Sequence, residues 1–373
     1  MNASRNTALC LPGGGVTGGL FQIGALSAFE AVFGEPSFGL FVGASSGAAV
    51  ASGIAGGLPV QRLYRALIDP ADNYFPLERH HLLNFDFGEW RRTIHSALSS
   101  VRHGLATLVA RSPAPMPADL WEQMDRFYDA LPAGLFSLDR YEHFLADFFL
   151  RRRVPNSFRS LSQRLLITAM DLDGGEPVVF GDPDLDHVPI SLACAASLAL
   201  PVFFSPVRIG ERYYVDASTS AVTGVDVACE HDAKFVVVIN PSVPVRTYDA
   251  TGGVPTGHGI RNSLRDKGLM WVYNQSMRSA VHSAIVESVS RAERESNAYV
   301  LLIEPDPGEA MRFMHNAASL SARRDILQWA FRTTREKLRT WAVDNPKILQ
   351  SAGWKLTNGA IADQASVPPV CGI

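Results

Sequence analysis

Cysteines are scarce in this sequence and show no pattern. The chain of 373 residues has four of them, and none forms a C-x-x-C pair. A disulfide scaffold or a structural zinc site needs closely spaced cysteines. The scatter argues against both and favours a reducing compartment. The four are Cys10, Cys194, Cys229 and Cys371.

Further absences narrow the class of protein. The sequence has no uninterrupted apolar run of about eighteen residues, the length that spans a membrane. Residues 1–5 lead into the first strand-like run without an apolar signal region. The net charge of −3 predicts no binding to nucleic acid. We therefore expect a soluble cytoplasmic protein that can touch a membrane surface transiently; non-classical export would leave no mark in such a sequence.

Metal-ligand spacing is absent as well. His80 and His81 are adjacent and cannot share a helix face, and no H-E-x-x-H motif occurs. The sequence predicts neither a metal nor an organic cofactor. The sequence is rich in hydrophobic residues, which make up 47% of the chain, and 19% of the residues are charged. This composition allows a sizeable hydrophobic core in one large domain or two.

The most informative motif is G-x-S-x-G at residues 43–47, directly after the apolar run at 38–42. A serine at such a sharp strand-to-helix turn exposes its hydroxyl, and the helix N-terminus behind it favours developing negative charge. Ser45 is therefore the candidate nucleophile. Gly43 and Gly47 supply the close backbone approach that the turn requires, and the amide of Ser46 can assist.

A glycine-rich segment lies about thirty residues upstream, between a strand-like run at 8–11 and an apolar helical pattern. Gly13, Gly14, Gly15 and Gly18 leave backbone N–H groups free to converge on an anion at the helix start, as an oxyanion hole requires. The same glycines satisfy the dinucleotide-binding pattern G-x-G-x-x-G. That pattern needs an acidic residue at the end of the second strand, where this chain has the serine turn instead.

The candidate base is Asp216, at the end of a hairpin-like stretch at 207–215 that follows an Ala-Ser…Pro…Phe segment. Taken alone, an aspartate here is more often a turn or helix-capping residue. A carboxylate can nevertheless accept the proton of a serine that lies within hydrogen-bond reach. Because an ordinary aspartate is a weak base, such a pair depends on oxyanion stabilisation and on partial exclusion of water.

These three motifs, in this order, resemble the patatin-like phospholipase family over roughly residues 7–240. The resemblance implies a serine–aspartate dyad, with Ser45 as nucleophile, Asp216 as base and the amides of the glycine loop as oxyanion hole. It implies a lipid acyl hydrolase of the phospholipase A or lysophospholipase type, with a lipid or fatty-acyl ester as substrate. The chain departs from the family pattern at Thr17, where a basic residue is usual, and at Ala217, where glycine is usual.

Alternatives remain open on the same residues. A triad would add His258 or His282 to Ser45 and Asp216, although triad hydrolases of the α/β type place several strands before the nucleophile and this chain has one. An acyltransferase or a thioesterase could use the same dyad. A lipid-binding regulator without turnover is also compatible with the departures at Thr17 and Ala217.

The fold class follows from alternating strand-like and helical segments. Fully apolar runs at 235–239 and 299–303 are typical of buried parallel strands, which predicts a three-layer α/β/α fold with a mostly parallel central sheet. We expect a patatin-like catalytic domain over 1–310, with a helical, cap-like insertion at 70–150. A C-terminal helix and tail over 311–373 would pack on this domain, and the tail after Lys355 would be loose.

Two segments are candidates for contact with lipid. In the insertion, apolar residues recur at steps of three and four, which marks one helix face that is either core or cap. The block at 148–153 joins two phenylalanines to three arginines that could touch anionic headgroups, although such a charge run is usually just solvated. A glycine-rich loop is expected at 251–259, followed by helices at 260–296 and 319–341. The apolar stripe comprises Trp90, Ile94, Leu98, Val101, Leu105 and Leu108.

Overall fold

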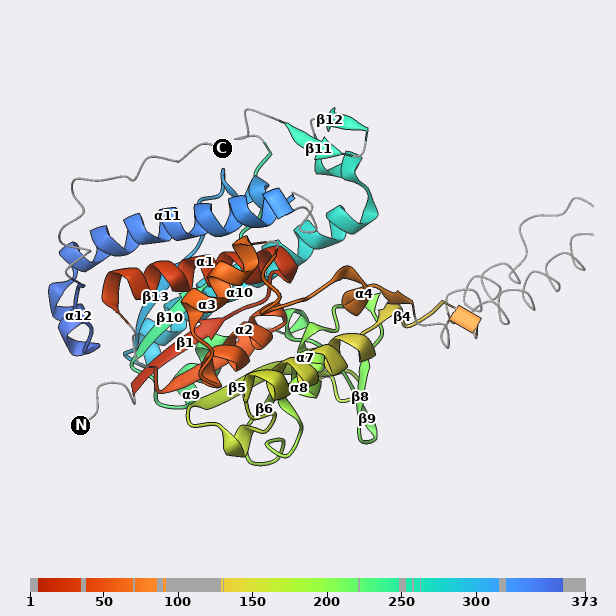
Figure 1. The fold of residues 1–373 in the computed structure, drawn as a ribbon, viewed down its shortest axis with the longest axis horizontal. Coiled ribbons are helices and arrows are strands. Elements are labelled where there is room, and N and C mark those ends of the chain that lie inside the picture. Colours follow the sequence, from red (N-terminus) through yellow and green to blue (C-terminus); the bar gives the residue numbers. More distant parts are fainter. Residues whose placement is uncertain are drawn as a thin grey trace, which may run out of the picture.

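The computed structural model describes residues 6–34, 38–69, 71–85, 90–91, 129, 131–220, 222–247, 253–256, 258–261, 263–314 and 320–357. Its centre is an eight-stranded sheet with the order β13-β10-β1-β2-β5-β9-β8, and β6 pairs with β5 (Figure 1). Strands β13, β10, β1, β2 and β5 are parallel to one another. Strands β6 and β9 pair antiparallel with β5, and β8 pairs antiparallel with β9. The bounds are β1 Thr7–Leu11, β2 Leu40–Ala44, β5 Arg164–Asp171, β6 Pro177–Phe180, β8 Val207–Ile209, β9 Arg212–Asp216, β10 Phe235–Ile239 and β13 Tyr299–Ile303.

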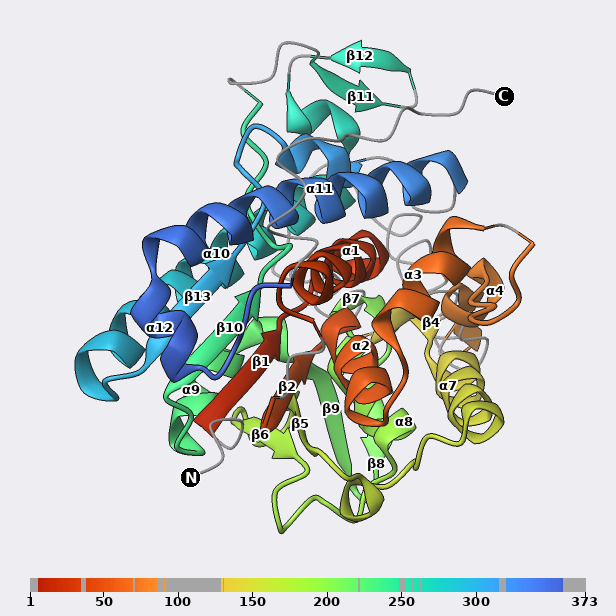
Figure 2. The same ribbon diagram turned by 60° about the vertical axis from the view of Figure 1, so that its left-hand side comes forward.

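Alternate residues of the strands face two separate cores. Leu9 and Val237 point into the core shared with α1, α2 and α11, while Ala8 and Val236 point into the core shared with α9 and α10. Figure 2 shows these helices on opposite sides of the sheet. The three-layer α/β/α fold predicted from the sequence is therefore present. The helices span α1 Gly15–Phe33, α2 Ser46–Ala55, α9 Gly224–Glu230, α10 Leu269–Glu295 and α11 Leu320–Asp344.

The strand order creates a topological switch point beside β1. From β1 the chain moves through β2 to β5 with α1 and α2 on one face, and it later returns to β10 on the other side of β1. In open α/β sheets, ligands bind outside the carboxyl ends of the strands at such a point. The loops after β1, β2 and β10 all lie at this edge.

Helix α1 is apolar around its whole circumference because it is covered on all sides. Its length and hydropathy are sufficient to cross a membrane, but 72% of the relevant window is buried inside the protein. The sheet lies beneath it and α11 packs along it, with Phe21 against Trp329 at 5.4 Å between ring centroids. This burial explains its composition as that of a core helix.

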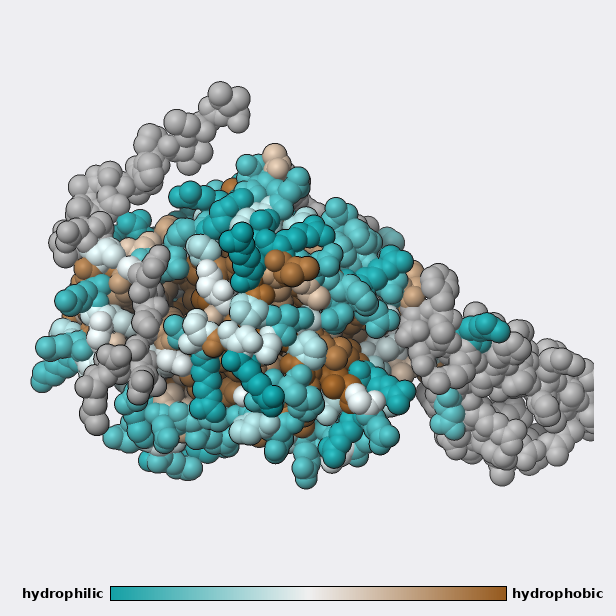
Figure 3. Space-filling view, turned by 60° about the horizontal axis from the view of Figure 1, so that its bottom comes forward, coloured by the Kyte–Doolittle hydropathy of each residue, from teal (hydrophilic) through white to brown (hydrophobic). Residues whose placement is uncertain are grey.

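The remaining elements surround this frame. A second small sheet joins β3, β4 and β7, and α7 packs on α8 beside it. Seen from below, the surface is largely hydrophilic, and hydrophobic side chains appear as patches between hydrophilic ones (Figure 3). The bounds are α3 Val60–Ile68, α4 Arg79–Leu82, β3 Asn84–Phe85, β4 Gly134–Ser137, α7 Asp139–Arg152, α8 Ile190–Leu198, β7 Val202–Phe204, β11 Val254–Thr256, β12 Gly259–Arg261 and α12 Pro346–Ser351.

The block at 148–153, a candidate for contact with lipid headgroups, uses its two phenylalanines for packing. Phe148 and Phe149 are buried in the main core, and Arg152 stacks on Tyr74 at 4.0 Å. Of the apolar side chains in this block only Leu150 is exposed, at 77%. Helix α7 therefore belongs to the body of the protein, because its apolar face is used for packing. Most of the Trp90-to-Leu108 stripe lies outside the described residues.

Two C-terminal expectations also need correction. In place of a glycine-rich loop at 251–259, β11 and β12 form an antiparallel hairpin, and α10 begins at Leu269 rather than at 260. The first residues after Lys355 are not loose, since Thr357 donates hydrogen bonds from its amide to Val32 and from its hydroxyl to Ala31. Residues 358–373 lie outside the described part, and the division at 310 stays a prediction.

Candidate active site

Ser45 occupies the sharp turn between β2 and α2. Its backbone φ of 53° and ψ of −127° lie in a region that a non-glycine residue seldom adopts. The side chain is largely buried, with 6% of the residue exposed. The geometry is that of a strained strand-to-helix elbow, as the G-x-S-x-G motif predicts.

The glycines of the motif are required by close packing. A Cβ on Gly47 would lie 2.0 Å from the Leu11 carbonyl oxygen, and one on Gly43 would lie 2.6 Å from Ala48 Cα. Neither contact is possible for a larger residue without movement of backbone. The motif thus brings the start of α2 directly against the end of β1, where the glycine loop begins.

Asp216 ends β9 and lies opposite Ala169 of β5. The residue is 2% exposed, and its Oδ1 accepts a hydrogen bond from the Ser218 amide at 2.8 Å. Burial raises the pKa of the Asp216 carboxyl, while hydrogen bonding from the Ser45 hydroxyl and from Ser218 opposes this rise. The structure thus brings together the serine and the aspartate that lie 171 positions apart in the sequence.

The glycine loop lies against the other side of Ser45. A Cβ on Gly13 would be 2.7 Å from Ser45 Cβ and 3.2 Å from Ser45 Oγ, so only glycine allows this approach. Gly14 precedes the first residue of α1, and Gly15 has a φ of +65°. Gly14 and Gly18 both pack against the ring of Pro241.

Two helix N-termini converge on this point. Neither α1 nor α2 has a side-chain cap, and neither carries an acidic residue in its first turn. Gly18 and Gly19 of α1 pack beside Ser46 of α2. Uncapped N–H groups at a helix start carry partial positive charge and attract anions. The arrangement can stabilise an oxyanion next to Ser45.

The two histidines of the triad alternative lie elsewhere. His258 is exposed on the β11–β12 hairpin. His282 lies on α10, with Nε2 3.3 Å from a carboxylate oxygen of Glu304. The His258 amide donates to Thr256 within its own hairpin, and the His282 ring faces Glu304. These contacts do not join either histidine to Ser45 or Asp216.

Three residues near the site were missed by sequence reasoning. Ser197 on α8 accepts a hydrogen bond from the Ser45 amide at 2.7 Å. Gln22 donates to the Pro12 carbonyl at 2.5 Å, and as the one amide side chain in a largely apolar helix it could have been noticed. Burial and then the Asp216 carboxylate raise the pKa of Tyr273, which places this phenol near the aspartate. Ser197 is the serine of the Ala-Ser…Pro…Phe segment, but only the fold reveals its role and that of Tyr273.

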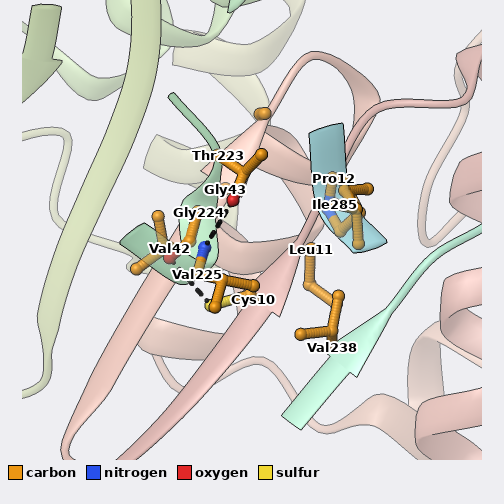
Figure 4. Close-up of a pocket in the computed structure, with 11 residues that line it drawn as sticks. Cys10, Leu11, Pro12, Val42, Gly43, Thr223, Gly224, Val225, Val238 and Ile285 are labelled. Atoms are coloured by element: carbon orange, nitrogen blue, oxygen red, sulfur yellow. Dashed lines mark hydrogen bonds between the residues drawn. The ribbon is translucent and has the colours of Figure 1, made fainter. Parts of the chain in front are cut away.

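Two cavities of the described part of the chain are lined by neither Ser45 nor Asp216. A cavity of about 10 Å³, room for one water, lies behind the ends of β1 and β2. Figure 4 shows it lined by Cys10, Gly224 and Ile285, and burial raises the pKa of the Cys10 thiol, which makes this thiol inert. A cavity of about 750 Å³ lies between α4 and α7 and is lined by neither Ser45 nor Asp216.

Comparison with known proteins identifies the family. A model described as patatin-like phospholipase matches residues 9–228, which include the glycine loop, the elbow and Asp216. The chain therefore belongs to the patatin-like phospholipase family. No curated protein matches the sequence.

The solved structures that match this chain share little sequence with it. VipD from Legionella pneumophila has 14% identity and a TM-score of 0.36, over 90% of this chain and 66% of that chain. The type III effector ExoU has 15% identity and a TM-score of 0.31, over 89% of this chain and 54% of that chain. A chain of the heterodimeric ExoU–SpcU complex from the type III secretion system of Pseudomonas aeruginosa has 14% identity and a TM-score of 0.28, over 96% of this chain and 65% of that chain. The chain thus spans less than two thirds of each of these proteins.

Proposed function

We propose that this protein is a serine acyl hydrolase that cleaves lipid carboxyl esters, of the phospholipase A or lysophospholipase type. The observation that carries the proposal is the meeting of Ser45, in its strained elbow, with the buried carboxylate of Asp216. The uncapped starts of α1 and α2 beside them support it further. Location in the cytoplasm, with transient contact with a membrane surface, stays a prediction.

The first half-reaction forms an acyl-enzyme. Ser45 Oγ attacks the ester carbonyl carbon, its proton passes to the Asp216 carboxylate, and the carbonyl π electrons move to the oxygen. The amides of Gly14, Gly15 and Ser46 would stabilise that oxyanion. When the tetrahedral intermediate collapses, the ester C–O bond breaks and Asp216 returns the proton to the leaving alcohol oxygen.

The second half-reaction repeats these steps with water. The oxygen of a water molecule attacks the acyl carbon while Asp216 accepts a proton from that water. The proton then passes to Ser45 Oγ as the fatty acid leaves. A raised pKa makes Asp216 a stronger base than an exposed aspartate, because burial disfavours its charge. An alcohol in place of water would give acyl transfer, and a thioester substrate would use the same atoms.

One experiment tests the proposal. One sample of the full chain is treated with a fluorophosphonate probe, and a separate untreated sample is assayed on phospholipids, lysophospholipids, an acyl thioester and a soluble short-chain ester, with and without an alcohol acceptor. We expect labelling of Ser45 and release of fatty acid from the phospholipid or lysophospholipid. Binding of lipid without labelling or release would identify a silent regulator, and dominant thioester cleavage or acyl transfer would change the class.

A further inference from the structure

The segment after β10 holds the glycine loop from behind. Ser242 Oγ donates a hydrogen bond to the Gly13 carbonyl at 2.5 Å, across 229 positions of sequence. The neighbouring Pro241 ring packs so closely on Gly14 that a Cβ there would lie 2.5 Å from Pro241 Cγ. We call residues 240–243 the strap.

The Ser242 hydrogen bond fixes the direction of one peptide group. The Gly13 carbonyl and the Gly14 N–H belong to the same planar trans peptide, so they point in opposite directions. Holding the carbonyl toward Ser242 therefore directs the Gly14 N–H away from the strap. The Cα of Gly13 faces Ser45, so this peptide lies beside the serine.

The strap itself is anchored on several sides. The Ser242 amide donates to Asn240 Oδ1 at 2.9 Å, and Asn240 Nδ2 donates to Glu304 at 3.2 Å. Arg278, which is 6% exposed, donates from one guanidinium nitrogen to the Pro241 carbonyl at 3.0 Å and to the Val243 carbonyl at 3.2 Å. Such a network, with its members bonded to one another, keeps the Ser242 hydroxyl in one place.

We propose that Ser242 is a positioning residue for the oxyanion hole, and that its hydroxyl keeps the Gly14 N–H directed toward the developing oxyanion at Ser45. This inference rests on the proposed function. Glycines on both sides of the peptide permit the tight approach to Ser45 but also permit the peptide to rotate, because neither has a Cβ. A rotated peptide would present a carbonyl oxygen to the oxyanion in place of a donor.

The buried guanidinium of Arg278 adds a fixed charge behind the same loop. Burial lowers the pKa of Arg278 to about 10, so the group stays protonated at neutral pH. Arg278 thus places a cation behind Pro241, whose ring packs on Gly14.

The test compares Ser242→Ala, Ser242→Thr and the control Ser276→Ala. Ser276 is an exposed serine on α10 whose hydroxyl also donates to a backbone carbonyl, that of Val272. On a soluble ester we expect Ser242→Ala to lower kcat by about 10- to 100-fold, between loss of one hydrogen bond and loss of one oxyanion donor. KM should change little, because the carbonyl oxygen of the bound ester gains its negative charge only as the transition state forms.

Two further measurements test whether Ser242 acts by orienting the Gly13–Gly14 peptide. Ser242→Thr retains a hydroxyl and should recover most of kcat, and Ser276→Ala should match the unmodified protein. A crystal structure of Ser242→Ala should show the Gly13–Gly14 peptide rotated or in two orientations. An unchanged kcat, or a lowered kcat with this peptide unmoved, would overturn the inference. If the unmodified protein hydrolyses no ester, the proposed function fails instead, and the peptide orientation still tests the positioning.

Discussion

The amide of Ser45 donates a hydrogen bond of 2.7 Å to the hydroxyl of Ser197, which in turn donates at 2.7 Å to the Thr168 carbonyl. Ser197 thus links the elbow to β5 and is bonded in both directions inside a buried site. A residue held at a φ of 53° keeps that conformation only when its surroundings determine it. The hydrogen bond to Ser197 is one of the contacts that hold Ser45 in this conformation.

Ser197→Ala should therefore lower activity without removing the nucleophile. The change leaves the buried Ser45 amide without its acceptor, which costs about 1–3 kcal/mol. If part of this free-energy cost is relieved by a shift of Ser45 out of its reactive position, kcat should fall by about 5- to 50-fold. Stopped-flow labelling by a fluorophosphonate measures the effect at Ser45 directly. Equal labelling rates in the two proteins would show that Ser197 serves stability alone.

Ser45→Ala should abolish both turnover and labelling, because no other group would form the acyl-enzyme. Ser46→Ala is the matched control, since its neighbouring hydroxyl is buried and makes no hydrogen bond among the described residues, while its backbone amide is retained. We expect Ser46→Ala to keep activity within a few-fold of the parent. Labelling that persists at another serine in Ser45→Ala would refute the assignment of the nucleophile.

Asp216→Asn should be nearly as damaging as Ser45→Ala, because an amide cannot accept the serine proton at neutral pH. His258→Ala and His282→Ala should retain substantial activity, since both histidines lie away from the pair. The measurement is kcat/KM of the purified variants on one soluble ester. Collapse in a histidine variant, with Asp216→Asn mildly affected, would replace the dyad by a triad.

Much of the fold could be predicted because its strands are short apolar runs with clear ends. The runs at 235–239 and 299–303 form β10 and β13, and the elbow and glycine loop lie where strand–turn–helix patterns place them. The antiparallel pairing of β9 with β5, which brings Asp216 to the site, is long-range and leaves no local pattern. The sequence indicates Asp216 as a candidate base at a strand end, but its pairing with Ser45 is implied only by the family resemblance.

The features that the sequence did not predict also depend on contacts between distant parts of the chain. An amphipathic pattern such as that of 139–152 does not say whether its apolar face meets lipid or protein, and here it packs on the core. The glycines at 252, 253 and 259 indicate a turn but not the hairpin around it. Ser197 and Ser242 act through hydrogen bonds to backbone groups far away in sequence, which residue type alone cannot indicate.

Substitutions at Gly15 should separate backbone conformation from packing. No atom lies within 4 Å of a Cβ at this position, but its φ of +65° is strained for a β-branched residue. Gly15→Val should lower kcat by about a hundredfold, comparable to loss of one oxyanion donor. Gly15→Asn, which tolerates this conformation, should be affected much less. If both variants fold and keep full activity, the loop has no part in catalysis.

The ionisation of Asp216 should make activity increase with pH, whereas the contribution of this residue to stability should decrease with pH. The dyad needs a charged carboxylate, so kcat/KM should fall on acidification through a pKa above the ordinary value of 3.8, because burial raises it. The folded protein then binds this proton more tightly than the unfolded chain. Stability from this group is complete below the unfolded pKa and is lost as pH rises through the folded pKa.

Asp216→Asn should therefore raise Tm at neutral pH while abolishing turnover, and the gain should vanish in acid. Asp226→Asn is the control of opposite sign. Burial raises the pKa of Asp226, but hydrogen bonds from Ser288 and Thr223 and the ion pair with Arg291 outweigh this and lower it. That carboxylate stabilises the fold above its unfolded pKa, so its removal should lower Tm at neutral pH. Thermal unfolding of both variants from acid to neutral pH measures the contrast, and a lower Tm for Asp216→Asn at neutral pH would contradict it.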